Sequence, residues 1–158
     1  NDFLGLFCLS AFLVLGCVET ATMYHGNEVT HVPVVTLQDG IQNAGTWKTF
    51  DLVVNYTYLK SGENLELTGE VELGQSYQMI YDGLRYLDLY LFFTDKDAMV
   101  LETVAFRGFL INTTDDKRKF TGSYKVPAGT VGFSFGYDGA VGGCDEAFSF
   151  YQLPLDNP

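Results

Sequence analysis

The fold is decided by residues 84–105, which read LRYLDLYLFFTDKDAMVLETVA. In the first half of this stretch, apolar side chains recur at every second position, the period at which side chains share one face of a β-strand; they are Leu87, Leu89, Leu91 and Phe93. Residues 94–97 (TDKD) are polar and suit a tight turn, and residues 99–105 are again rich in apolar and β-branched side chains. The stretch therefore predicts a hairpin of two long antiparallel strands.

Alternating patterns recur on both sides of this hairpin, separated by turns that contain Gly, Pro or polar residues. They cover residues 50–58, 65–73, 120–126, 131–137 and 147–153. Residues 30–37 (THVPVVTL) add one edge strand, because Pro33 has no amide proton to give to a neighbouring strand. Strands at a spacing of about ten residues, with no amphipathic helix after residue 20, are typical of an antiparallel sandwich or barrel. We predict an all-β fold, an antiparallel β-sandwich of about eight strands with immunoglobulin-like or jelly-roll topology.

The length and composition allow one domain of this kind together with an anchor. The chain has 158 residues, and its 47% hydrophobic and 15% aromatic content excludes a disordered chain. We divide it into an apolar leader or membrane anchor at residues 1–18, a tether that could hold an edge strand at residues 19–47, and the sandwich domain at residues 48–158.

The leader has the character of an export signal or a membrane anchor. Residues 3–18 (FLGLFCLSAFLVLGCV) carry no charge, and as a helix they would rise about 24 Å, slightly less than the hydrocarbon thickness of a bilayer. Val14-Leu15-Gly16-Cys17 resembles the lipobox of bacterial lipoproteins, in which a small residue precedes a cysteine that becomes lipidated. This resemblance covers the leader alone. It implies lipidation of Cys17 and a membrane-anchored chain facing the periplasm or the cell exterior, and a retained N-terminal helix is the alternative anchor.

The charge and the cysteines exclude two further classes. The net charge is −11, from 9 basic and 20 acidic side chains, so the chain is repelled by phosphate backbones and we expect no nucleic-acid binding. Most of the basic residues lie between residues 96 and 125, which leaves the rest of the chain strongly acidic and able to attract a basic partner; solubility is the simpler explanation. Cys8 and Cys17 lie in the leader and Cys144 is alone, so no disulfide framework follows.

One motif resembles that of a serine hydrolase without its expected context. Residues 132–136 (GFSFG) match G-x-S-x-G, in which the serine lies on a sharp turn between a strand and a helix, and the histidine follows later in the chain. Here Ser134 lies inside an alternating strand, and both histidines come earlier. We therefore predict a chain that is not an enzyme and has no catalytic residue.

Two places in the sequence carry side chains that could ligate a metal. His25, Glu28 and His31 could ligate a metal through nitrogen and oxygen, but their spacing fits neither a helix face nor a hairpin site. Carboxylates in the predicted turns could bind calcium, although aspartate is also common in turns for local hydrogen-bonding reasons; these residues are Asp95, Asp97, Asp138, Asp145 and Glu146. We predict no metal site and no cofactor.

A partner-binding surface is the function that the sequence favours. The second face of the central strand carries Tyr86, Asp88, Tyr90 and Phe92, and tyrosines with an apolar body and a polar tip are favoured at interfaces. The alternative is that this strand is packed on both faces. We predict an accessory subunit that binds protein partners in a larger membrane assembly, or else a lipoprotein that binds a saccharide or a small apolar molecule through these tyrosines.

Overall fold

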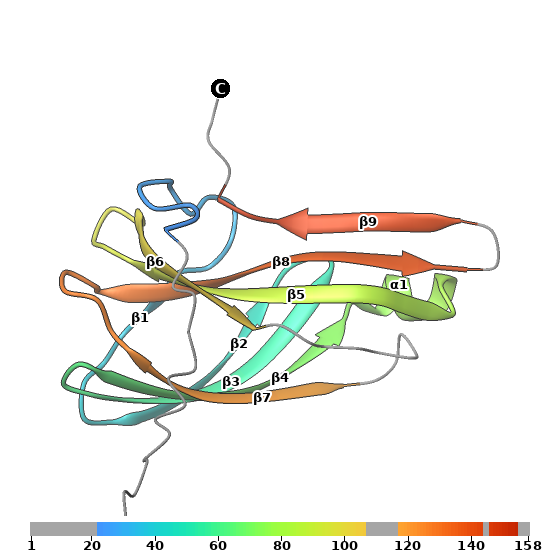
Figure 1. Cartoon of the computed structure of the whole chain (residues 1–158). Coiled ribbons are helices and arrows are strands. Elements are labelled where there is room, and N and C mark those ends of the chain that lie inside the picture. Colours follow the sequence, from blue (N-terminus) through green and yellow to red (C-terminus); the bar gives the residue numbers. More distant parts are fainter. Residues whose placement is uncertain (1–21, 107–116, 144–145, 155–158) are drawn as a thin grey trace, which may run out of the picture.

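The computed structural model describes residues 22–106, 117–143 and 146–154. Its strands form two antiparallel sheets that pack face to face (Figure 1). Sheet 1 consists of β1 (Val35–Thr36), β5 (Gly83–Thr94), β6 (Val100–Phe106), β8 (Gly132–Gly142) and β9 (Ala147–Gln152). Sheet 2 consists of β2 (Gln42–Lys48), β3 (Leu52–Ser61), β4 (Asn64–Leu73) and β7 (Arg118–Lys125). The all-β, antiparallel architecture in two sheets confirms the prediction at that level.

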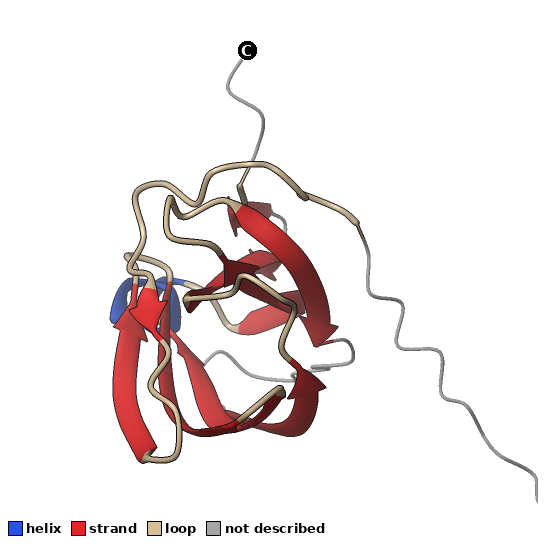
Figure 2. Cartoon of the chain, turned by 90° about the vertical axis from the view of Figure 1, so that its left-hand side faces the viewer, coloured by secondary structure: helices blue, strands red, loops and turns tan. Residues whose placement is uncertain are grey.

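The predicted hairpin is the centre of sheet 1. β5 pairs with β6 on one side and with β8 on the other, and the turn between β5 and β6 covers residues 95–99, close to the predicted 94–97. The far edge of β8 is shared, because β1 pairs with its first two residues and β9 pairs with residues 137–142. In sheet 2 the order is β2-β3-β4-β7. Figure 2 looks along the strands and shows the two curved sheets as separate layers.

The core lies between the sheets and is built from the alternating faces that the sequence shows. Leu87, Leu89, Leu91 and Phe93 are at most 3% exposed, which confirms the core face of the central strand. Rings from β8 meet rings from sheet 2 there, with Tyr58 packing edge-on against Phe133 at a centroid distance of 5.5 Å. Trp47 of β2 is fully buried against Phe135 and Tyr137. Apolar burial on both inner faces is the main term that holds such a sandwich together.

Two glycines of sheet 2 are required by aromatic rings on neighbouring strands. A Cβ added to Gly45 would lie 2.5 Å from the hydroxyl of Tyr56, and a Cβ on Gly69 would lie 2.3 Å from the ring of Phe120. In both cases the ring belongs to the cross-strand partner of the glycine. The rings therefore fill the space that a side chain would otherwise take, which keeps the core face closed.

Residues 22–32, which we call the N-terminal clasp, fold over the outer face of sheet 1. The clasp pairs with the hairpin through three backbone hydrogen bonds, each 2.9 Å long: Gly26 N–H donates to Val100 O, Val29 N–H to Ala98 O, and Val100 N–H to Asn27 O. The Asn27 side-chain amide donates to Pro154 O at 2.7 Å, which joins the clasp to the residues after β9. Val29, Phe92 and Val100 form a small second core beneath it.

The structure differs from the sequence prediction at three places. From residue 22 onward, the expected tether is part of the sandwich, as the clasp, β1 and β2. The edge strand expected over residues 30–37 is reduced to two residues, and β2 was not expected. The connection before the hairpin holds a short helix, α1 (Gln75–Ile80). The predicted N-terminal helix, Cys17, Cys144, Asp145 and the continuation of the hairpin past residue 106 lie outside the described residues.

Candidate functional site

The predicted partner-binding face is partly covered in the structure. Phe92 is 1% exposed, because the ring of Tyr24 in the clasp packs edge-on against it at a centroid distance of 5.7 Å. Tyr90 is half-buried and stacks on Phe92. The second part of the face remains open: Tyr86 is 39% exposed and donates to Asp138 Oδ1 at 3.2 Å. Asp88, half-buried, is the cross-strand partner of Asp138.

The four residues therefore do not form one open surface. Tyr90 and Phe92 belong to the second small core, whereas Tyr86 and Asp88 lie beside Asp138 on β8. The prediction of one open face differs from the structure because the clasp covers Tyr90 and Phe92. The sequence shows no strand pattern in the clasp, so its docking on this face was not predicted. The role of these residues in partner binding stays a prediction.

The residues weighed for chemistry are also placed by the structure. Ser134 is fully buried inside β8 and donates to Pro33 O at 2.7 Å. His25 contacts the carbonyl oxygen of Leu101 through Nδ1, and His31 is exposed. Asp95 Oδ1 accepts from the backbone N–H groups of Asp97 and Met99, so it stabilises its own turn. Asp138 pairs with the middle of β5, far from that turn. Within the described ranges no three His, Cys, Asp or Glu side chains gather as metal ligands would.

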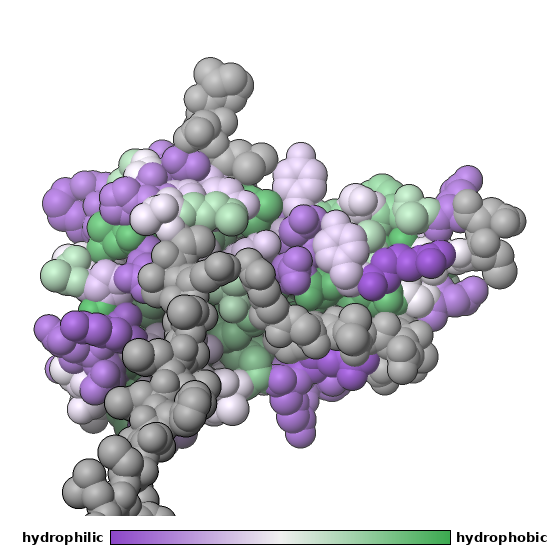
Figure 3. All heavy atoms as spheres, viewed as in Figure 1, coloured by the Kyte–Doolittle hydropathy of each residue, from purple (hydrophilic) through white to green (hydrophobic). Residues whose placement is uncertain are grey.

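One end of the molecule exposes an unusual amount of apolar surface. Phe50 and Met79 are each 78% exposed, Ile80 is 69% exposed and Phe148 is 47% exposed. Together with Tyr81 we call these residues the apolar end. They come from the β2–β3 turn, from α1 and from the start of β9. Figure 3 shows hydrophobic atoms at the surface along the start of β9, at the end of the molecule where α1 lies. Contiguous exposed apolar patches in a folded protein mark interaction sites.

Aromatic contacts join the separate parts of the apolar end. The buried ring of Tyr77 on α1 lies 6.3 Å from the ring of Phe50 and 6.0 Å from that of Phe148. Tyr81 stacks on Phe148 at 6.2 Å. Tyr77 therefore acts as the common support from which the exposed side chains project.

A carboxylate holds this support in place. Tyr77 donates its hydroxyl to Asp51 Oδ1 and Tyr137 donates its hydroxyl to Asp51 Oδ2, each at 2.6 Å. Thr49 Oγ1 lies 2.9 Å from the hydroxyl of Tyr137 and extends the network. Hydrogen bonds from a hydroxyl to a carboxylate at this distance are among the stronger ones in proteins. Asp51 thus links α1 to the core of the sandwich.

This network predicts a loss of stability in alkaline solution. Burial, followed by the hydrogen bond to Asp51, raises the pKa of Tyr77 and of Tyr137 above the ordinary value for tyrosine. Their neutral forms therefore stabilise the folded chain fully below about pH 10, and this contribution is lost as the pH rises further.

We expect the phenols of Tyr77 and Tyr137 to ionise only as the chain unfolds, in an absorbance titration at alkaline pH. In urea all ten tyrosines should titrate together, with a pKa of about 10. Tyr77→Phe and Tyr137→Phe should each remove one late-ionising phenol. A folded chain in which every tyrosine titrated as in urea would contradict the network.

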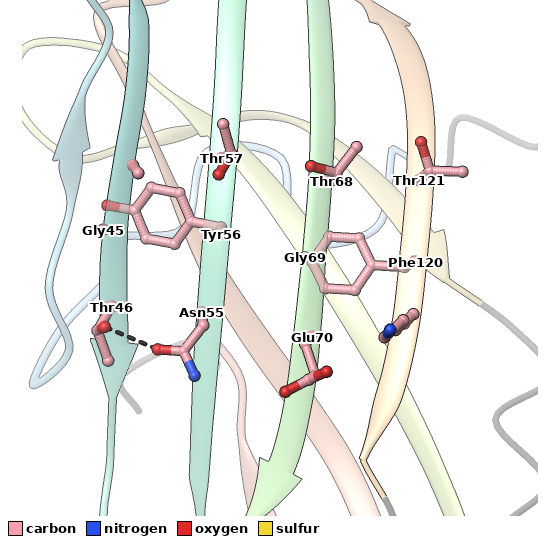
Figure 4. Close-up of a pocket in the computed structure, with 12 residues that line it drawn as sticks. Gly45, Thr46, Asn55, Tyr56, Thr57, Thr68, Gly69, Glu70, Phe120 and Thr121 are labelled. Carbon is pink, nitrogen blue, oxygen red and sulfur yellow. Dashed lines mark hydrogen bonds between the residues drawn. The ribbon is translucent and has the colours of Figure 1, made fainter.

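A second surface lies on the outer face of sheet 2. Two rows of side chains cross its four strands and are two residues apart along each strand (Figure 4). One row is Ala44, Thr57, Thr68 and Thr121, and the other is Thr46, Asn55, Glu70 and Lys119. Between them runs a shallow trough of about 800 Å³, whose floor includes the backbone at Gly45 and Gly69. Because side chains alternate between the faces of a strand, the residues between the rows turn theirs toward the core.

The trough is close to neutral in charge, and its lining combines hydroxyl, amide and charged groups with apolar surface. Its charged members are Glu70 and Lys119, and Lys117 beside it binds Glu70 at 3.2 Å and Glu72 at 3.5 Å. Thr46 donates its hydroxyl to Asn55 Oδ1 at 2.7 Å. Three further threonines, Thr57, Thr68 and Thr121, offer hydroxyl groups on methyl-bearing stems.

Neither surface is predicted from the sequence. The signal for the apolar end was present as Met79-Ile80, two large apolar residues in a stretch interpreted as a plain connection, and as Phe50, which was placed in the alternating face of a strand that begins only at Leu52. The signal for the trough was the outward set of positions in residues 50–58, 65–73 and 120–126, whose alignment across the sheet depends on the strand register.

Comparison with known proteins yields no relative for this chain: no family model, no curated protein and no solved structure matches it. In the part of the chain that the structure covers, no helix has the length and apolar character needed to cross a membrane. The fold and its two surfaces are therefore the basis for a functional proposal.

Proposed function

We propose that this chain is a non-enzymatic interaction module that docks to a protein partner through the apolar end. In this proposal residues 1–18 anchor it to a membrane, by lipidation of Cys17 or as a helix, and it faces the periplasm or the cell exterior as an accessory subunit of a larger membrane assembly. The β-sandwich, whether immunoglobulin-like or jelly-roll, is the scaffold. The exposure of Phe50, Met79 and Ile80 is the observation that supports the proposal most.

The occupant that fits the apolar end is a protein surface with an apolar centre and a basic rim. The exposed acids Asp82 and Glu146 lie beside Tyr81 and Phe148 in the chain, and the net charge is −11. An acidic domain is repelled by the anionic surface of a bilayer, which disfavours insertion of this end into lipid. A basic rim on a partner would be attracted by the same charge.

The direct test is cross-linking from the apolar end. A photoreactive side chain at position 79, introduced into the full-length chain in its native membrane, should give one reproducible adduct with an identified protein, and the cross-linked peptide should be apolar with Lys or Arg nearby. The same photoreactive group at Ser123, which is exposed on β7, should not give this adduct. An adduct with lipid alone, or no adduct above that of the Ser123 position, would contradict the proposal.

Substitution of the apolar end gives the quantitative prediction. We expect Phe50→Ser combined with Ile80→Ser to weaken partner binding by about 30-fold or more, since two apolar anchors at an interface that contribute about 1 kcal/mol each give about 2 kcal/mol together. Because both side chains are exposed, the melting temperature should hardly change. Val131→Ser, an exposed apolar residue before β8, is the matched control and should leave binding unchanged. Equal affinity of the double variant and the original chain would exclude the apolar end as the docking surface.

A further inference from the structure

We infer that the trough on the outer face of sheet 2 is a binding site for a neutral saccharide chain lying across the strands. It spans four strands, which are about 4.8 Å apart, and its two walls are about 7 Å apart along the strand direction. Its volume of about 800 Å³ is within the usual range for ligand sites. This site is separate from the apolar end, so either proposal can fail without the other.

The first support is a row of hydroxyl groups without protein partners. Thr57, Thr68 and Thr121 are cross-strand neighbours, and in Figure 4 they lie in line across β3, β4 and β7. Over the residues that the structure describes, none of their three hydroxyls hydrogen-bonds to another protein group. Each hydroxyl can donate one hydrogen bond and accept two, so the row can bind a ligand that offers both functions at regular intervals.

The opposite wall completes this pattern. Asn55 uses its carbonyl oxygen to accept from Thr46, so its amide N–H groups point to no protein acceptor among the described residues. Lys119 forms no ion pair within the same part of the chain and supplies a donor, whereas Glu70 supplies an acceptor. Donors and acceptors therefore face each other across the trough.

The balance of charge and apolar surface selects the class of ligand. Glu70 is compensated by Lys117 and faces Lys119 across the strand pair, so neither a strongly anionic nor a strongly cationic ligand is favoured. The apolar part of the lining comes from Ala44, from the threonine methyl groups and from Tyr56 and Phe120, whose rings pack mainly against the core. A lipid chain would leave the hydroxyl and amide groups of both walls without hydrogen-bond partners. A sugar ring has polar edges and small C–H faces, which match hydroxyl walls lined with methyl groups.

The shape selects a chain rather than a single sugar. The trough crosses the whole sheet, from β2 at one edge to β7 at the other, and its lining includes residues of all four strands. Such a site can hold internal units of a polysaccharide. Without a stacking ring the affinity should be in the millimolar range for a hexasaccharide, and repeated sugar units would raise it.

The test is a titration of the full-length, isotope-labelled chain in a zwitterionic detergent that has no sugar headgroup. The probes are the neutral hexasaccharides of the maltose, cellulose, laminarin, mannan and chitin series, each added to about 10 mM. We expect at least one of them to shift backbone amide resonances of β3, β4 and β7 next to the trough. No shift with any of the five, or shifts confined to other strands, would overturn the inference.

Matched variants identify the groups involved. Thr68→Val keeps the shape of the side chain and removes its hydroxyl, and Asn55→Ala removes the amide; each should weaken binding by about fivefold with little change in melting temperature. Ser123→Ala, in the next row of β7, is the control and should bind as the original chain does. Unchanged affinity of both trough variants would overturn the site. Tighter binding of an anionic hexagalacturonate than of any neutral probe would overturn the ligand class.

Discussion

Trp47→Ala is expected to lower the free energy of unfolding by about 3–5 kcal/mol, the cost typical of removing a buried aromatic ring. Trp47 has no exposed surface, and its ring packs edge-on against Phe135 at 5.7 Å and Tyr137 at 6.2 Å. Its Nε1–H donates to Pro33 O at 3.0 Å. Because Trp47 belongs to the edge strand β2 and its contacts belong to β8, the cavity would open between the two sheets.

The measurement is chemical unfolding in urea followed by circular dichroism, because Trp47 is the only tryptophan and its fluorescence would be lost. Trp47→Phe should cost less, about 1–2 kcal/mol, since a ring remains but the donor is removed. Phe50→Ala is the control: its ring is 78% exposed, so the change should stay within about 0.5 kcal/mol. A loss below about 1 kcal/mol for Trp47→Ala would show that the sheets do not pack as described.

Asp51→Ala should have the next largest effect, a loss of about 3 kcal/mol. It removes the acceptor of two hydroxyl groups, and bonds to a charged group contribute about 1.5–3 kcal/mol each, a value reduced here because Asp51 is only half-buried. The hydroxyl of Tyr137 would keep Thr49 as a partner, whereas Tyr77 would keep none in the part of the chain described. The buried hydroxyl of Tyr77 left without an acceptor is the main source of the loss.

A double-mutant cycle separates this effect from general damage. Tyr77→Phe alone and Asp51→Ala alone should not be additive, because each removes the same hydrogen bond. The coupling free energy should be at least about 1 kcal/mol. Asp82→Ala, an exposed carboxylate just after α1, serves as the control and should be neutral. Full additivity of the two substitutions would contradict the hydrogen bond between Tyr77 and Asp51.

Regular alternation of apolar and polar residues made most of the strands predictable. Where this alternation is interrupted, as in β2, the strand was not predicted. The first strand of the central hairpin and the strands of residues 65–73 and 120–126 follow a period of two, so both their existence and their buried faces were predicted correctly. β2 (QNAGTWK) has Gly45 at a core-facing position, and the space is filled by the ring of Tyr56 from the next strand. A core position occupied by a neighbour's side chain leaves no trace in the local pattern.

The clasp was unpredictable for a related reason. Tyr24 and His31 adopt positive φ angles of 67° and 64°, which non-glycine residues rarely do, and the segment is held by scattered backbone bonds to the hairpin rather than by a ladder. Because the clasp packs over Phe92 and does not reach Tyr86, Phe92 is buried and Tyr86 is exposed. The apolar end and the trough were beyond sequence reasoning because each is assembled from strands or turns that are distant in the chain, and their closeness depends on strand register.

The clasp and the apolar end lie at opposite ends of β5, so the length of this strand separates them. The clasp is bonded to the turn that follows Thr94, whereas α1 ends just before Gly83 (Figure 1). Twelve residues of extended strand separate the two, a span of about 40 Å. A chain attached through residues preceding the clasp would thus hold the apolar end about one strand length away from the point of attachment. If residues 1–18 anchor the chain to a membrane as proposed, the partner contact would lie away from the bilayer surface.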